Sequence, residues 1–139
     1  MAETVRDVMT KNPASLASDA TVLDAARLMR DRDIGDVLVT DSGAIRGIVT
    51  DRDLVVRVLA DGRDPAKTRL AEVVSQEIET LPPTASVEEA VDLMMKRALR
   101  RIPVVEYERA IGIVAIGDLA VGRDPHSALG QISAANPNR

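Results

Sequence analysis

Apolar residues recur with a helical period in two separate stretches of the chain. In residues 22–29 and again in 87–94 they stand at i, i+3, i+4 and i+7, with charged residues between them. Thr21-x-x-Asp24 precedes the first stretch and Ser86-x-x-Glu89 the second, and both are capping boxes or near variants. The pattern predicts two amphipathic helices, each with a defined start.

Short β-branched runs follow both helices, at 37–40 and 102–105. They are continuous rather than alternating, which is typical of strands covered on both faces. A second apolar strand begins near a glycine in each case, Gly47 or Gly112, and a further helix follows. Residues 41–43, Asp-Ser-Gly, predict a turn between the first two strands. The counterpart at 106–109 is a weaker turn signal.

The chain is an internal repeat. A shift of 65 residues aligns 8–54 with 73–119 without a gap, with identical residues at many positions. Neither copy carries enough apolar surface to fold alone, so the sequence predicts one α/β (α+β) fold of two β-α-β-β-α copies with pseudo-twofold symmetry. The expected parts are repeat one at 5–62, a linker at 63–69, repeat two at 70–124 and a loose C-terminal tail at 125–139.

The amino-acid composition argues against several classes of function. Among 139 residues the formal charge is −4 and Tyr107 is the only aromatic, which argues against a nucleic-acid surface. The absence of cysteine excludes thiolate chemistry and cysteine metal sites. Residues 1–20 lack the layout of a signal peptide and no apolar run is long enough to span a membrane. We therefore expect a cytoplasmic protein that binds neither nucleic acid nor membrane.

The two copies differ at the start of their last helix. Repeat one reads Gly-Ile-Val-Thr-Asp-Arg-Asp-Leu over 47–54, and repeat two reads Gly-Ile-Val-Ala-Ile-Gly-Asp-Leu over 112–119. Thr50 and Asp53 place a hydroxyl and a carboxylate on one helix N-terminus, whereas Ala115 replaces the hydroxyl beside Asp118. Thr50-x-x-Asp53 is also a helix cap that needs no ligand.

Catalytic and metal sites have little support. The only histidine, His126, lies outside the repeats and is expected on the surface, so no nucleophile–base set can be built in the usual ways. Asp51 and Asp53 could suggest Mg²⁺, but Arg52 between them speaks against it. The methionines at helical spacing, Met29, Met94 and Met95, are expected to fill the core or a dimer contact. We expect neither an enzyme nor a metal site.

Together these features resemble the cystathionine β-synthase (CBS) domain. The residues that carry the resemblance are the capped helix, the Arg-Arg-Ile-Pro-Val-Val strand at 100–105, and the Gly-x-x-Thr-x-x-Asp pattern at 47–53. Two copies in tandem resemble a Bateman module, and the whole chain is similar to small stand-alone bacterial CBS-pair proteins. The resemblance implies a regulatory module that binds AMP, ADP or ATP, less often S-adenosylmethionine or NAD, in the cleft between the repeats. It also implies a homodimer and an unidentified protein partner, with no cofactor required.

The resemblance assigns residues to a nucleotide site. Asp53 would take the ribose hydroxyls, with Thr50 near the ribose or phosphate, and a carboxylate suits a diol. Arg100 and Arg101 of repeat two would take the phosphates, because guanidinium groups match phosphate oxygens. The residues implied near the base are Ile78, Glu79 and Leu99.

The matching second site departs from the family pattern. Asp118 is present, but Gly35 and Asp36 stand where the arginines would be, and Ala115 cannot donate a hydrogen bond. Asp36 would repel a phosphate, so we expect one competent nucleotide site per chain and one degraded site. The degraded site could still hold a neutral or cationic adenosine compound such as S-adenosylmethionine.

A second function remains open from the residues alone. Arg100 and Arg101 could pair with acidic side chains on a solvated face, where such pairs contribute little. The alternative is a ligand-free module that dimerises and binds another protein.

Overall fold

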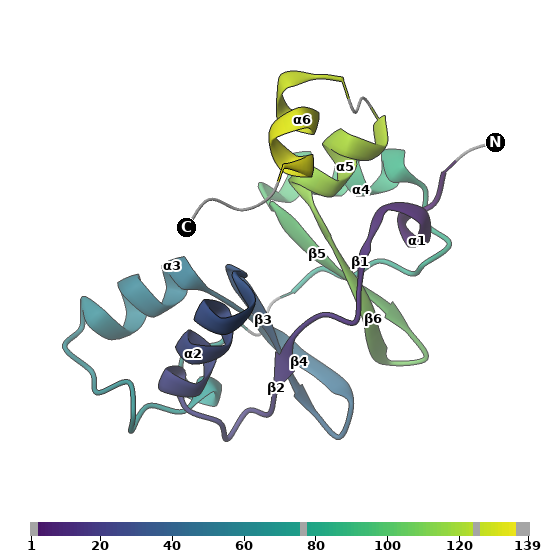
Figure 1. Cartoon of the computed structure of the whole chain (residues 1–139). Coiled ribbons are helices and arrows are strands. Elements are labelled where there is room, and N and C mark those ends of the chain that lie inside the picture. The colour runs from purple at the N-terminus through teal and green to yellow at the C-terminus, as the bar shows by residue number, and fades with distance from the viewer. Residues whose placement is uncertain (1–2, 76–77, 124–125, 136–139) are drawn as a thin grey trace. The chain divides into compact units, whose positions relative to one another are not determined.

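The computed structural model describes residues 3–75, 78–123 and 126–135. The chain forms two compact units, one of Pro13–Ile78 and one of Met1–Asn12 with Glu79–Arg139. We call them the repeat-one unit and the repeat-two unit. Figure 1 shows the elements of both, coloured from the N-terminus to the C-terminus.

The repeat-one unit has a three-stranded sheet covered by helices. The short strand β2 pairs in parallel with β3, and β3 pairs antiparallel with β4. The apolar face of α2 packs on this sheet, and buried residues of α2, β3 and β4 share one core. In chain order the elements are β2 (Ser15–Leu16), α2 (Val22–Arg32), β3 (Asp36–Asp41), β4 (Ala44–Thr50), α3 (Asp51–Leu54), the π-helical turn η1 (Val55–Leu59) and the 3₁₀ turn η2 (Leu70–Glu72).

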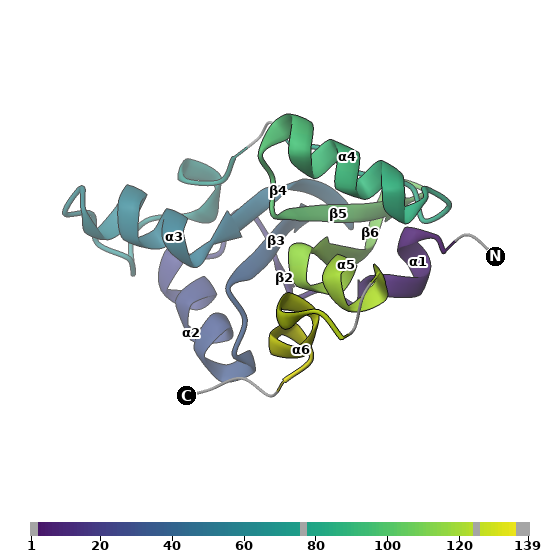
Figure 2. The same ribbon diagram turned by 90° about the horizontal axis from the view of Figure 1, so that it is seen from above.

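The repeat-two unit repeats this plan. Strand β6 pairs antiparallel with both β5 and β1, and Leu81 bridges Val104 in parallel, as β2 pairs with β3 in the other unit. Helices α5 and α6 lie side by side in both views (Figures 1 and 2). The elements are α1 (Val5–Val8), β1 (Thr10–Lys11), α4 (Val87–Arg97), β5 (Arg101–Glu106), β6 (Arg109–Ala115), α5 (Ile116–Arg123) and α6 (Ala128–Ala134).

The first turn of each repeat packs in the unit of the other repeat. Val5 on α1 is fully buried in the core built by α4, β5 and β6. Leu70 on η2 is fully buried in the core built by α2, β3 and β4. The compact units therefore have different boundaries from the sequence repeats 5–62 and 70–124.

The segment predicted as a linker, 63–69, packs against α2. Thr68 is buried, and its hydroxyl donates to the Asp64 carbonyl at 2.8 Å. The Val22 N–H donates to the Thr68 carbonyl at 2.9 Å, which ties this segment to the start of α2.

The predicted helix starts are confirmed. The Asp24 N–H donates to the Thr21 hydroxyl at 3.1 Å, and the Thr21 N–H donates to the Asp24 carboxylate at 2.9 Å, which is a full capping box. The Glu89 N–H donates to the Ser86 hydroxyl at 3.0 Å.

Both hairpins turn through two residues with left-handed backbone. Ser42 and Gly43 have φ of 54° and 85°, and Tyr107 and Glu108 have φ of 51° and 67°. Positive φ at both positions matches the right-handed twist of the strands. The second turn was a weak signal because Tyr and Glu, unlike Gly, are not enriched in this conformation.

The loose tail expected at 125–139 is corrected over its described part. Residues 128–134 form α6, which packs against α5 and begins at Ser127, whose hydroxyl accepts from the Gly130 N–H at 3.0 Å. The Ser127 cap and helix formers such as Ala128, Leu129 and Gln131 favour this helix although it contains Gly130. Pro125 and 136–139 lie outside the described residues. None of the described helices is both long and apolar enough to cross a membrane.

Stability should fall in acid through the repeat-one unit. The pKa of Asp24 is lowered by the Thr21 N–H, that of Asp41 by the Ser18 N–H, and that of Glu72 by the Arg69 N–H. Because each folded pKa lies below the unfolded value of about 4, the stabilisation is complete above that pH and is lost as pH falls through the folded pKa. These three carboxylates should leave the urea midpoint of unfolding unchanged between pH 7 and pH 5. The midpoint should decrease as the pH falls below about 4.

Asp24→Asn is the check on this acid response. It should reduce the loss of stability between pH 5 and pH 3, because the variant lacks one of the carboxylates that must be protonated. A loss of equal size in the variant and the parent would contradict the role given to Asp24.

Candidate functional site

At the end of β4, Thr50 and Asp53 form a capping box that begins α3; we call this polar site the Thr50 corner. The Thr50 N–H donates to Asp53 Oδ2 at 2.8 Å, and the Asp53 N–H donates to Thr50 Oγ1 at 3.2 Å. The Asp53 side chain is 21% exposed, and its Oδ1 lies 3.8 Å from Arg57 Nε. The cap reading is thus confirmed, yet a carboxylate offers about four acceptor positions. Asp53 can cap the helix and still accept from a ligand.

The hairpin register decides what lies beside this corner. Asp36 stands directly opposite Thr50 across β3 and β4. The Asp51 N–H donates to the Gly35 carbonyl at 3.0 Å. Within the repeat-one unit, the ribose-binding candidates therefore have Asp36 beside Thr50, and Arg57 as a basic neighbour of Asp53.

The start of α5 in the repeat-two unit has the same backbone with different side chains. The Ala115 N–H donates to Asp118 Oδ2 at 2.8 Å, so the carboxylate keeps its place although the hydroxyl is missing. Arg101 stands opposite Ala115 across β5 and β6, and the Ile116 N–H donates to the Arg100 carbonyl at 2.9 Å. The two arginines are thus local neighbours of Asp118, the carboxylate of the site predicted to be degraded.

Of the residues assigned to the base, Ile78 and Glu79 lie where the chain passes from one unit to the other, and Leu99 packs against the core of the repeat-two unit. Ile78 ends the repeat-one unit and is half-buried. Glu79 begins the second part of the repeat-two unit, and its carboxylate pairs with Arg97 Nε at 3.3 Å. Leu99 lies among apolar side chains of α4 and α5 that line a pocket of about 350 Å³.

The structure therefore brings together two sets of predicted residues. Thr50 and Asp53 lie beside Gly35 and Asp36 in the repeat-one unit. Asp118 and Ala115 lie beside Arg100 and Arg101 in the repeat-two unit. The sequence had grouped these positions across the repeats, and that grouping stays a prediction.

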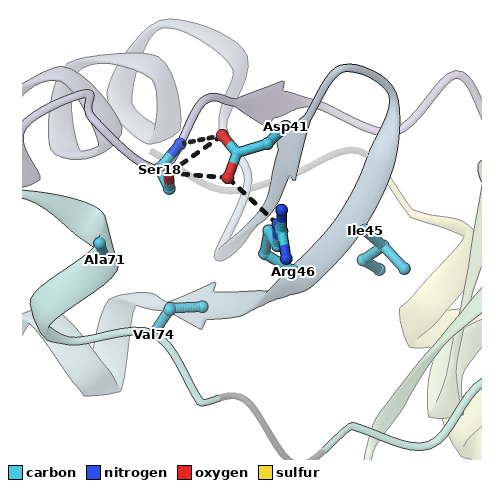
Figure 3. Close-up of a pocket in the computed structure, with 6 residues that line it drawn as sticks. All are labelled: Ser18, Asp41, Ile45, Arg46, Ala71 and Val74. Carbon is cyan, nitrogen blue, oxygen red and sulfur yellow. Dashed lines mark hydrogen bonds and ion pairs between the residues drawn. The ribbon is translucent and has the colours of Figure 1, made fainter.

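Sequence reasoning missed one polar pocket in the repeat-one unit. It encloses about 410 Å³ at the far end of β3 and β4 from Thr50, and Figure 3 shows the side chains around it. Asp41 accepts from the Ser18 hydroxyl at 2.8 Å and from Arg46 Nε at 3.2 Å. In Figure 3, Ala71 and Val74 lie below the polar row formed by Ser18, Asp41 and Arg46, and Ile45 completes the lining.

Comparison with known proteins identifies the family. The family described as "CBS domain" matches residues 5–60 and 70–121. "CBS domain-containing protein YhcV" of Bacillus subtilis is 38% identical over 126 residues, which is 91% of this chain and 89% of that protein.

Solved structures of CBS proteins have the same fold as this chain. The crystal structure of Hypoxic Response Protein I with two coordinated zinc ions superposes with a TM-score of 0.76 at 34% identity, over 84% of this chain and 96% of that one. A hexameric CBS-CP12 protein from bloom-forming cyanobacteria gives a TM-score of 0.79 at 29% identity, over 90% of this chain and 74% of that one. Among the described residues of the present chain, no three His, Cys, Asp or Glu side chains gather as a metal site would need. With two matched repeats and relatives of nearly its own length, the chain belongs to the CBS domain family as a tandem CBS pair.

Proposed function

We propose that this CBS pair is a non-enzymatic regulatory module that binds an adenine nucleotide of the AMP, ADP or ATP class. The observation that carries the proposal is the start of α3, where the half-buried Asp53 carboxylate accepts from the Thr50 N–H and the Thr50 hydroxyl accepts from the Asp53 N–H. Such pre-organisation lowers the cost of binding a ribose diol.

Arg100 and Arg101 are the proposed phosphate ligands. Arg100 is exposed and Arg101 is half-buried at the start of β5, so both lie where a ligand can reach. Their guanidinium groups can bind phosphate oxygens in bidentate fashion. The acidic side chains around Thr50 make this help necessary, because Asp36 and Asp51 alone would disfavour a phosphate there.

Calorimetry with AMP, ADP, ATP, NAD and S-adenosylmethionine tests the proposal. Asp53→Asn should weaken the best nucleotide at least about tenfold, since charged hydrogen bonds contribute about 1.5–3 kcal/mol each. Asparagine keeps an acceptor oxygen for the Thr50 N–H, so the helix cap should survive. We expect one nucleotide per chain.

Asp118→Asn is the matched control, because Asp118 caps α5 as Asp53 caps α3. An effect of Asp118→Asn alone would move the nucleotide to the repeat-two corner beside Arg101. Equal affinities in both variants and the parent would contradict the ribose role of either carboxylate. Replacing Arg100 and Arg101 by Gln, alone and together with Asp53→Asn, shows by coupling energy whether the arginines and Asp53 contact one ligand.

A ligand-free self-associating module is the second candidate. Several large apolar side chains are exposed on the helices, among them Leu59 at 64%, Met95 at 76% and Ile132 at 71%. Apolar side chains left exposed in this way can pack against another chain. A dimer in light scattering together with a silent nucleotide panel would support this function over nucleotide sensing.

A further inference from the structure

The pocket beside Ser18 and Asp41 differs from the matching place in the repeat-two unit. The repeat alignment pairs Ala71 with Arg6 and Arg46 with Ile111. In the repeat-two unit, Arg6 Nη2 pairs with Glu106 Oε2 at 2.9 Å, and Glu106 is the counterpart of Asp41. The repeat-one unit has Ala71 where that arginine would be, and its arginine comes from β4 instead.

The different residues at these two positions leave a pocket beside Ala71 and change which nitrogen of the arginine contacts the carboxylate. Ala71 has no side chain beyond Cβ, so the volume that a longer side chain could fill remains as part of the 410 Å³ pocket. Arg46 reaches the carboxylate through Nε, the inner edge of its guanidinium group. In the repeat-two unit the contact uses a terminal nitrogen of Arg6.

The outer edge of Arg46 is therefore available to a ligand. Arginine has five N–H donors, and only Nε–H is used by Asp41. In the described part of the chain, no protein group accepts from Nη1 or Nη2 of Arg46, and the side chain is 62% exposed. Two parallel N–H groups are the geometry that binds a carboxylate in bidentate fashion.

Asp41 fixes this arginine and limits the charge of the ligand. Its carboxylate accepts from the Ser18 N–H at 3.1 Å and from the Ser18 hydroxyl, so it is held from two sides. It also cancels most of the positive charge of Arg46. A singly charged group therefore suits the pocket better than a phosphate dianion.

The remaining lining is apolar. Ile45, Ala71 and Val74 complete the wall around the polar row (Figure 3). The volume lies within the range of about 300–1,000 Å³ for small-molecule sites. We propose that this pocket binds a small monocarboxylate with an apolar body, its carboxylate on Arg46 and its apolar part against Ile45 and Val74.

Nuclear magnetic resonance on the full chain tests the proposal with 3-methylbutanoate, hexanoate and benzoate at millimolar concentration. At least one probe should shift the amide signals of Ser18, Ala71 and Val74. Arg46→Gln should weaken that binding at least about tenfold. Arg30→Gln is the matched control, because Arg30 also pairs through Nε with an aspartate, Asp31, on an exposed helix face.

Ala71→Arg, which copies Arg6 of the repeat-two unit, should abolish the response by filling the pocket. Ala71 is exposed, so the variant should fold. No shift with any probe, or equal shifts in Arg46→Gln and the parent, would overturn the proposal. Equal shifts from inorganic phosphate would overturn it too, since they would show a general anion contact. Asp53→Asn should leave the carboxylate response unchanged, so this test and that of nucleotide binding succeed or fail separately.

Discussion

Leu70→Ala is expected to destabilise the repeat-one unit by about 2–5 kcal/mol, the usual cost of removing a buried leucine side chain. Leu70 is fully buried in the core of α2, β3 and β4, although it begins the second repeat in the sequence. Its N–H also donates to the Ala20 carbonyl at 2.9 Å, which holds the turn close to the start of α2. A cavity there cannot be closed by a small shift of η2 without breaking this contact.

Native-state hydrogen exchange locates the effect. In Leu70→Ala the amides of β3 and β4 should lose protection, and those of β5 and β6 should change little. Val5→Ala is the mirror experiment, because Val5 is fully buried in the repeat-two core. In Val5→Ala the amides of β5 and β6 should lose more protection from exchange than those of β3 and β4.

The opposite pattern would contradict the exchange of first turns between the units. If Leu70→Ala deprotected β5 and β6 while Val5→Ala deprotected β3 and β4, each turn would pack in the unit of its own repeat. A uniform loss in both variants would instead show that the two units unfold together and do not open separately.

Periodicity predicted the elements because it is a local property. The helix over 22–32 and its start at Thr21 follow from apolar spacing and a cap, and both are confirmed. The exchange of first turns is not local. Val5 and Leu70 occupy matching places in the alignment, so nothing in their own sequence says which of two similar cores each one enters.

In the candidate site, too, the local features could be predicted from the sequence and the long-range contacts could not. The helix corner at Thr50 could be predicted, since a capping box is a spacing of three residues. That Arg101 stands opposite Ala115 depends on the register of the β5–β6 hairpin, which contains an irregularity between Val104 and Val105. The pocket at Arg46 has a signal in the sequence, the unmatched pairs Ala71/Arg6 and Arg46/Ile111, but only the fold brings Ala71 and Arg46 to one pocket.

Gly47→Ala is the second change with a large expected effect. Gly47 is buried in β4, and a Cβ atom there would overlap sterically with the Ser75 carbonyl oxygen and the Val74 side chain. Ser75 is bridged to Ile48, so its backbone cannot withdraw without losing that pairing. Overpacking of this kind costs about 1–3 kcal/mol and occasionally more.

Gly112→Ala is the matched control, because Gly112 holds the same position in β6. A Cβ atom there would meet mainly the Met9 side chain, with the Thr10 carbonyl oxygen at 2.9 Å. Methionine is flexible and can move aside, so the loss of stability should be smaller than for Gly47→Ala. Urea unfolding of the two variants gives the comparison. Equal or reversed losses would show that β4 tolerates a side chain at Gly47, in which case the glycine would not be required for the close approach of Ser75 to the strand that leads to Thr50.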